Sequence, residues 1–231
     1  MSNVDVVMSY EQWLALPGEW VEPPNERRGG VSGVQRVYLD AQHLLYRKQQ
    51  AGHIYRSFAH PLGYPTVMRE YQALLDCQRL HVPVPTVVFA SCAKEQGIWK
   101  ALLLTESLVG FRSLEECYAE GEEQCWGEVL HKKVLAECGR VLGRLNAGRR
   151  QHGCLYLKHI FVRVREEQVD VALIDLEKSR RRLLRKQAAR HDLRQIFRRA
   201  GWRGELLHSF IQGYQESFGS LEGLAVSAVH N

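Results

Sequence analysis

The order in which strand-like and helix-like segments follow one another limits the fold of this chain more than any other feature. Short runs of β-branched, Leu and Tyr residues, typical of strands, fill much of residues 27–106, where one amphipathic helix is expected over 65–80. Later residues show helical periodicity, which predicts helices over 131–149, 187–199 and 205–218. A continuous parallel sheet needs strands and helices to alternate throughout. The sequence therefore excludes such a sheet and predicts an α+β body with two lobes.

The predicted strands are short and several of them pair through polar turns. Six segments are expected as strands: 34–39, 43–49, 86–91, 98–105, 160–164 and 169–174. Polar turns of three and four residues join the first two and the last two, which indicates two hairpins. The first 26 residues have no clear period and end near Pro23-Pro24, so we expect an irregular, loosely packed N-terminal arm.

Composition places the chain among ordinary globular proteins. Its 231 residues are 45% hydrophobic and 25% charged, which suits one large domain or two joined lobes. No apolar run reaches the ~18 residues of a membrane span, and Asp5 and Glu11 stand where a secretory signal would be basic or apolar. Six scattered cysteines without a C-x-x-C pair suggest reduced thiols. We therefore expect a cytoplasmic protein.

The charges are unevenly distributed along the chain. Residues 1–26 carry five acidic side chains and no Lys or Arg, although the whole chain has a net charge of +5. Seven cations fall within thirteen residues: Lys178, Arg180, Arg181, Arg182, Arg185, Lys186 and Arg190. They indicate an anionic partner or else a solvated helix face. Nucleic acid is disfavoured, because residues 177–196 hold no Phe, Trp or Tyr on which bases could stack.

A glycine-rich turn precedes the first hairpin. Residues 28–33 read Arg-Gly-Gly-Val-Ser-Gly, and Gly29, Gly30 and Gly33 would let backbone N–H groups approach phosphate oxygens. The turn does not match the P-loop pattern G-x-x-x-x-G-K-[ST]. The alternative is a turn that merely connects two strands.

Two charged residues follow the turn at intervals that could bring them together. Lys48 lies inside a predicted strand, where it could reach the α- and β-phosphates of a nucleotide. Glu70 lies 22 residues later, next to the apolar face of the predicted helix, and could pair with a lysine. Taken alone, each is better explained as a solvated surface charge.

Polar residues also gather after the helix predicted over 131–149. Residues 152–159 read His-Gly-Cys-Leu-Tyr-Leu-Lys-His, a loop in which His and Cys suggest either catalysis or turn packing. Asp175 ends the apolar strand that precedes it. A carboxylate at the tip of a buried strand is costly unless it binds a metal or hydrogen-bond donors, so Asp175 is the residue least well explained as surface.

Together, these motifs resemble the lipopolysaccharide kinase family (Kdo/WaaP, InaA-type) of the protein kinase-like superfamily, over about residues 25–215. The resemblance implies a two-lobed kinase-like fold with a β-rich N-lobe over 27–106 and a helical C-lobe over 107–231, after an N-terminal arm over 1–26. Gly29, Gly30, Gly33, Lys48, Glu70 and Glu106 would then bind ATP. His159 and Asp175 would hold Mg²⁺. Asp192 resembles the buried acid that supports the catalytic loop.

The resemblance also implies a substrate and a location. The acceptor would be a sugar hydroxyl of the lipopolysaccharide core, an anionic glycolipid that suits the basic run. The protein would act in the cytoplasm or bound peripherally to the anionic inner membrane.

One departure from the family pattern concerns catalysis. Cys154 stands where kinases carry the Asp that orients the substrate hydroxyl. His152, Cys154 and Lys158 are therefore the candidate catalytic residues of an active enzyme. The alternative is a pseudokinase that binds nucleotide and acts as a stress-linked regulatory or interaction protein.

Overall fold

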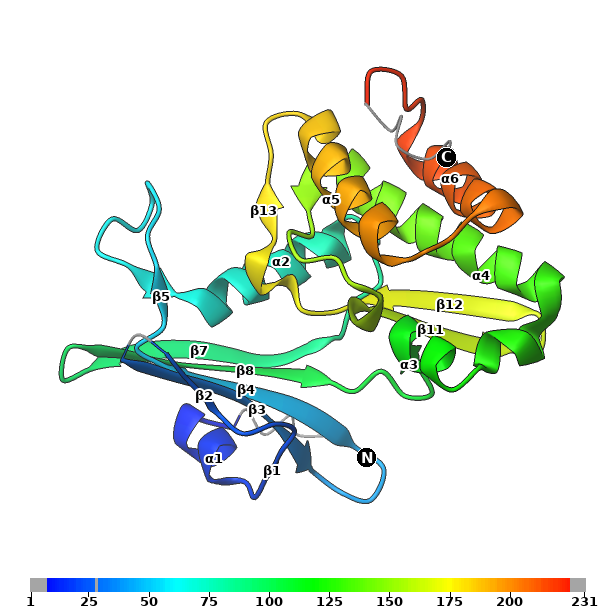
Figure 1. The fold of residues 1–231 in the computed structure, drawn as a ribbon. Coiled ribbons are helices and arrows are strands. Elements are labelled where there is room, and N and C mark those ends of the chain that lie inside the picture. The colour runs from blue at the N-terminus through cyan, green and yellow to red at the C-terminus, as the bar shows by residue number, and fades with distance from the viewer. Residues whose placement is uncertain (1–7, 28, 225–231) are drawn as a thin grey trace, which may run out of the picture. The chain divides into compact units, whose positions relative to one another are not determined.

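A computed structural model describes residues 8–27 and 29–224 of the chain (Figure 1). The chain divides into two compact units. The first comprises the chain up to Tyr71 together with Thr86–Ser107, and the second comprises Gln72–Pro85 together with the chain from Leu108 onward. Helix α2 (Thr66–Arg79) contributes residues to both. No helix within the described ranges is both long and apolar enough to cross a membrane.

The first unit is built on one antiparallel sheet. Its strands follow the order β1-β3-β4-β8-β7, and β2 also pairs with β3. Their bounds are β1 Glu19–Trp20, β2 Asn25–Arg27, β3 Gly30–Tyr38, β4 Leu44–Ala51, β7 Val87–Glu95 and β8 Ile98–Glu106. A small separate hairpin joins β5 (Ile54–Tyr55) to β6 (Tyr64–Pro65). The strands predicted within residues 34–105 are confirmed.

Local side-chain chemistry explains the first hairpin. The Asp40 carboxylate accepts hydrogen bonds from the backbone N–H groups of Gln42 and His43, at 2.8 and 3.0 Å. The carboxylate thus satisfies two backbone N–H groups of the turn between β3 and β4, as in an Asx turn. β8 lies between β4 and β7 and carries the run Ala101–Leu104, which is fully buried.

The prediction of an irregular, loosely packed N-terminal arm is wrong for the described part of that segment. Residues Tyr10–Ala15 form helix α1, and a capping box between Ser9 and Gln12 closes its N-terminus. Trp13 is buried in the same apolar cluster as Val37, Leu45, Leu102 and Leu104. The buried guanidinium of Arg47 donates to the carbonyls of Trp13, Leu14 and Leu16. A six-residue helix has too few positions to reveal its period, and distant Arg47 fixes its end.

Within the described residues, the second unit combines the C-terminal part of α2 and four further α-helices with a small sheet. The helices are α3 Leu114–Ala119, α4 Glu122–Ala147, α5 Arg185–Arg199 and α6 Gly204–Phe218. The sheet has the order β12-β11-β9, from β9 Arg112–Ser113, β11 Ile160–Arg165 and β12 Gln168–Leu173. A second short ladder pairs β10 (Arg150–Gln151) with β13 (Arg180–Arg181). The predicted second hairpin and the three predicted late helices are confirmed.

Helices α4 and α6 pack side by side and share the most extensive interface between described elements of this unit (Figure 1). Their backbones approach so closely that a Cβ at Gly139 would overlap the Phe210 carbonyl oxygen. The sequence did not indicate α3, which a capping box from Ser113 to Glu116 begins. It also placed the start of α4 nine residues late, because Gly127 interrupts the helical backbone there with a φ of 67°.

Candidate active site

In the first unit, Lys48 and Glu70 form an ion pair. Lys48 lies on β4, and Glu70 lies in the second turn of α2. The Lys48 Nζ donates to the Glu70 Oε2 at 2.7 Å, and the two side chains are only 18% and 12% exposed. The start of α2 is fixed to the same strand, because the Gln50 side chain accepts from the Val67 backbone N–H at 3.0 Å. A partly buried pair held by two regular elements is not a solvated surface contact.

The predicted glycine-rich turn is shorter than expected, because Gly30 and Gly33 lie in β3 and only Gly29 lies in the turn between β2 and β3. The three glycines have different surroundings. Arg28 of this turn lies outside the described residues. A side chain at Gly30 would approach the Ala51 carbonyl oxygen to 2.8 Å, and one at Gly33 would meet the Trp20 ring. Packing alone therefore requires glycine at both. Gly29 has a φ of 73°, and a Cβ added at this position would have no neighbouring atom within 4 Å. Gly29 is therefore the glycine whose backbone is open to a ligand.

Glu106 ends β8 and is exposed. Its backbone N–H donates to the Thr86 carbonyl at 2.9 Å, and the next N–H, that of Ser107, donates to Leu44. These two amides are therefore already engaged within the sheet. Any contact of Glu106 with a nucleotide base is left to its carbonyl or its side chain.

In the second unit, buried Asp192 holds the loop that begins at His152. One Asp192 carboxylate oxygen accepts from the His152 backbone N–H at 2.7 Å and from the Asn146 side chain at 2.8 Å. The other accepts from the Gly153 backbone N–H at 3.2 Å. Asn146 in turn accepts from the Tyr214 hydroxyl at 2.9 Å. These bonds confirm the prediction that Asp192 supports this loop, and Asn146 and Tyr214 extend that support to α4 and α6.

The sequence did not predict two further features that support the loop. The Gln195 side chain accepts from the Leu155 backbone N–H at 2.6 Å, one helical turn after Asp192. Gly153 has a φ of 87°, and a side chain there would overlap the Lys178 carbonyl. An i,i+3 pair of Asp and Gln on α5 is a signal for this support, but only once the loop is known to lie over that helix.

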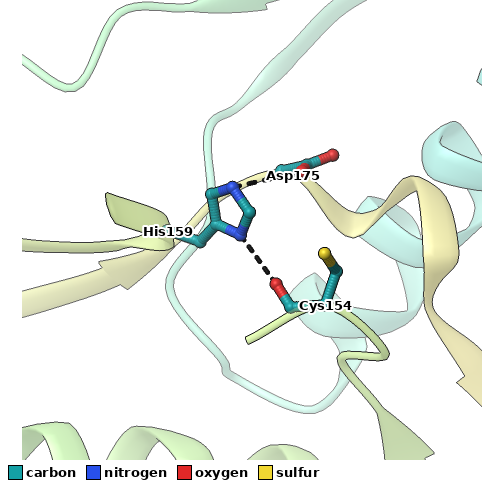
Figure 2. A group of neighbouring side chains, drawn as sticks. All are labelled: Cys154, His159 and Asp175. Atoms are coloured by element: carbon teal, nitrogen blue, oxygen red, sulfur yellow. Dashed lines mark hydrogen bonds and ion pairs between the residues drawn. The ribbon is translucent and has the colours of Figure 1, made fainter. Parts of the chain in front are cut away.

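His159 and Asp175 face each other beside this loop (Figure 2). The His159 Nε2 lies 3.2 Å from the Asp175 Oδ2, and the His159 Nδ1 lies 2.7 Å from the Cys154 carbonyl oxygen. Burial lowers the pKa of His159, so the imidazole is neutral near pH 7. A carbonyl only accepts, so Nδ1 carries the proton and Nε2 turns a lone pair toward the carboxylate. Two acceptors at this distance favour a cation between them.

Asp175 reaches this position through an unusual backbone. Its φ of 57° and ψ of 59° lie in the left-handed region, immediately before the short helix η2 (Leu176–Lys178). Asp adopts this region more readily than most residues. Its side chain is 41% exposed whereas that of His159 is 8% exposed, so a ligand could reach the pair from the Asp175 side.

The three predicted catalytic residues have different surroundings. Cys154 is half-buried, and the Lys178 ammonium lies 4.0 Å from its sulfur. Lys158 is exposed on the short helix η1 (Leu157–His159). His152 is completely buried, burial lowers its pKa, and its ring stacks on that of His159 with centroids 5.9 Å apart. His152 therefore supports the neighbouring His159 from inside the protein, whereas Cys154 and Lys158 are accessible.

The residues present fit a divalent cation. Mg²⁺ takes oxygen ligands and usually binds through one or two carboxylates plus substrate phosphates, which the Asp175 carboxylate suits. The lone pair of His159 supplies a second donor on the same side. Cys154 adds a sulfur, which is a softer ligand than Mg²⁺ prefers.

Arginines line a hollow on α5 in the same unit. The hollow has a volume of about 470 Å³, and its lining residues are Arg182, Gln187, Arg190, His191, Arg194, Gln195, Arg198 and Arg199. Only Arg182 and Arg190 belong to the basic run singled out in the sequence. The Arg185 guanidinium and the Lys186 ammonium instead donate to main-chain carbonyls at or beyond the end of α6. Arg190 lines the hollow and also donates through one nitrogen to the Gly223 carbonyl. The concentration of positive charge thus lies further along α5 than expected.

The hollow adjoins the loop that Asp192 supports. The Arg199 guanidinium stacks on the Tyr156 ring, 4.1 Å from its centroid, and donates to the Tyr156 hydroxyl at 3.2 Å. Gln195 contributes to the hollow and also holds Leu155. An anion bound in this hollow would therefore lie against the loop that carries Cys154.

Comparisons with known proteins agree with these features. The model of the lipopolysaccharide kinase (Kdo/WaaP) family matches residues 11–214. Protein InaA of Escherichia coli (strain K12) is 38% identical over 187 residues, which cover 81% of this chain and 86% of InaA. The solved structure of WaaP in complex with acyl carrier protein aligns with a TM-score of 0.66 and 20% identity, covering 93% of this chain and 87% of that chain. This likeness confirms the predicted α+β kinase-like fold. The chain belongs to the lipopolysaccharide kinase (Kdo/WaaP) family.

Proposed function

We propose that this protein is an ATP- and Mg²⁺-dependent phosphotransferase whose acceptor is a sugar hydroxyl of the lipopolysaccharide inner core. The observation that carries the proposal is the partly buried ion pair between Lys48 and Glu70. In kinases, a strand lysine held by a helix glutamate positions the nucleotide phosphates. Family membership makes the same role the best explanation of this pair.

Asp175 and His159 would hold the metal. When bound, Mg²⁺ neutralises phosphate charge, which is a large part of catalysis in phosphoryl transfer. Asp175 supplies the anionic oxygen that such an ion prefers, and the bond from His159 to the Cys154 carbonyl keeps Nε2 directed toward Asp175. Gly29 is the glycine best placed to bring a backbone amide to phosphate.

Cys154 takes the position of the residue that orients the acceptor hydroxyl. General base catalysis typically accelerates a reaction by only about 10²–10⁴-fold. Phosphoryl transfer depends mainly on positioning and charge neutralisation. A thiol at this position is therefore compatible with a slow enzyme. Lys158, exposed on the same loop, and Lys178, 4.0 Å from the sulfur, are the nearby cations that could assist.

The arginine-lined hollow on α5 supports an anionic acceptor. Guanidinium groups bind phosphates and carboxylates through paired hydrogen bonds. A concave site of about 470 Å³ suits an acidic or phosphorylated sugar next to the loop that carries Cys154. A glycolipid acceptor implies that the enzyme works at the cytoplasmic face of the inner membrane, whose anionic surface attracts the same cations.

A pseudokinase is the second candidate, and Cys154 is the observation that favours it. Without the usual Asp, the chain could bind nucleotide and act through its partners. The two candidates share nucleotide binding but differ in turnover.

The experiment is a titration with ATP in the presence and absence of Mg²⁺, followed by ATP turnover with core glycolipid. We expect Mg²⁺-dependent binding that Lys48→Met weakens, together with turnover that requires the glycolipid. Firm binding without turnover would favour the pseudokinase. Wild-type protein that binds no Mg²⁺-ATP at millimolar concentration would exclude both.

A further inference from the structure

We infer that Cys154, His159 and Asp175 form a site for a transition-metal ion, and that Zn²⁺ is the ion that this site prefers. The Cys154 sulfur, a His159 ring nitrogen and an Asp175 carboxylate oxygen all lie within 4.8 Å of one another. Figure 2 shows the three side chains converging from the loop before η1, from η1 itself and from the residue before η2. This site does not require that the protein be a kinase.

The spacing suits a single small ion. Two ligands of a tetrahedral zinc at about 2.0–2.1 Å from the metal lie roughly 3.3 Å apart. The His159 Nε2 and Asp175 Oδ2 already lie 3.2 Å apart. The sulfur, which bonds zinc at about 2.3 Å, lies within 4.8 Å of the other two donor atoms, so the Cys154 side chain would move toward the ion to complete the set.

The imidazole is already oriented for a metal. Metal-binding histidines usually donate their second ring N–H to a carbonyl or carboxylate, which fixes the tautomer. The His159 Nδ1 lies 2.7 Å from the carbonyl of Cys154, so the backbone of one ligand fixes the ring of another. The buried ring of His152 stacks on the face of the His159 ring and restrains its rotation.

The donor types select the metal. A set of sulfur, imidazole and one carboxylate suits Zn²⁺ better than Mg²⁺, for which the Asp175 oxygen is the best of the three donors. Three protein ligands leave a fourth position for water or another ligand, the arrangement of accessible zinc sites. Zn²⁺ binding would release the thiol proton to solvent as the zinc–sulfur bond forms. The Lys178 ammonium, 4.0 Å from the sulfur, can donate to the resulting thiolate. Zn²⁺ would bind to His159 and Asp175, the same two side chains that we assign to Mg²⁺.

Cobalt substitution gives a direct test that does not depend on activity. Untagged, metal-free protein is titrated with Co²⁺ while its absorption spectrum is recorded. We expect one Co²⁺ per chain, with a thiolate-to-cobalt charge-transfer band that added Zn²⁺ removes. Cys154→Ser should abolish the band and weaken Zn²⁺ binding at least tenfold, as measured against a chromophoric chelator. His159→Gln and Asp175→Asn should weaken binding similarly.

Cys125→Ser is the matched control, because Cys125 is an exposed thiol on α4 outside the cluster. It should leave the cobalt band and the Zn²⁺ affinity unchanged. A wild-type spectrum without a thiolate band, or a band that persists in Cys154→Ser, would overturn the inference. Failure of phosphoryl transfer would not affect it, so this site and the proposed function can fail independently.

Discussion

The Lys48 ammonium lies 2.7 Å from a Glu70 carboxylate oxygen, although the two residues are 22 positions apart in the chain. The β4 strand fixes one partner and the second turn of α2 fixes the other. A lysine held in this way is positioned before any ligand arrives, which lowers the ordering cost of binding phosphate.

Removing the charge of Glu70 should therefore weaken nucleotide binding. Glu70→Gln keeps the shape but loses a charge-assisted hydrogen bond, a change worth about 1.5–3 kcal/mol or roughly 10–100-fold. We expect the Kd for Mg²⁺-ATP, measured by calorimetry, to rise within that range. Glu95→Gln is the control, because the Glu95–Lys100 pair is about half exposed and lies in the same sheet. Equal effects of the two substitutions would contradict the assigned role.

Cys154→Asp should raise turnover. A carboxylate at this position orients the acceptor hydroxyl better than a neutral thiol, and the gain could reach the ~10²-fold lower end of general base catalysis. The measurement is initial rate with core glycolipid, and Cys154→Ala is the comparison for loss of the thiol. A rate that falls in Cys154→Asp would mean that the site has been rebuilt around the sulfur. Turnover in Cys154→Asp but none in the wild type would identify a pseudokinase.

Acid should destabilise the fold through the buried histidines. Burial lowers the pKa of His152 in the folded protein, against the weaker opposing effect of the Asp192 charge. Below about pH 6.5 the unfolded chain then binds a proton that the folded chain does not. Stability therefore falls as pH falls through that value, by at most about 1.4 kcal/mol per pH unit for one group.

The slope can be assigned with a pair of variants. His152→Phe should flatten the dependence of the unfolding free energy on pH between 7 and 5, as measured by urea denaturation. His208→Gln, which removes an exposed histidine of α6, should leave the slope unchanged. An unchanged slope in His152→Phe would show that His152 does not contribute to acid sensitivity.

The arginines of α5 should contribute to binding of the acceptor and not to binding of ATP. The double variant Arg194→Gln/Arg198→Gln removes two lining charges of the hollow, and we expect the KM for an anionic glycolipid to rise ~3–30-fold. The KM for ATP should stay constant. The control, Arg36→Gln/Lys133→Gln, removes the same charge from exposed positions elsewhere. If both double variants raise the KM for the glycolipid equally, acceptor binding depends on the overall positive charge of the protein and not on the hollow.

Strong periodicity made much of the fold predictable. The hairpin of β3 and β4, helix α2 and helices α4 to α6 each have several apolar positions on one face, so their patterns exceed chance. The pairing of Lys48 with Glu70 was expected from the family resemblance, and it required that the strand and the neighbouring helix be correctly located. Helices α1 and α3 have six residues each and offered too short a pattern.

The parts of the site that the sequence did not reveal depend on tertiary contacts. The spacing of Asp192 and Gln195 on α5 does not identify Leu155, 40 positions earlier, as a partner of Gln195 until the loop is placed over that helix. Arg194, Arg198 and Arg199 line one hollow together with Arg182, and Arg199 also reaches the hydroxyl of Tyr156, 43 positions earlier. The sequence pattern instead indicates the seven-cation run, although Arg185, Lys186 and Arg190 of that run donate hydrogen bonds to carbonyls at or beyond the end of α6.

Direct detection of the phosphorylated product tests the central claim most directly. Wild-type protein is incubated with Mg²⁺-ATP and inner-core glycolipid that has been stripped of phosphate, and the glycolipid mass is measured. We predict the addition of a single phosphate by the wild type, and at least ~10²-fold less product with Asp175→Asn, which removes the charge assigned to metal binding. Firm Mg²⁺-ATP binding by the wild type, with no phosphate on any core glycolipid, would contradict the claim.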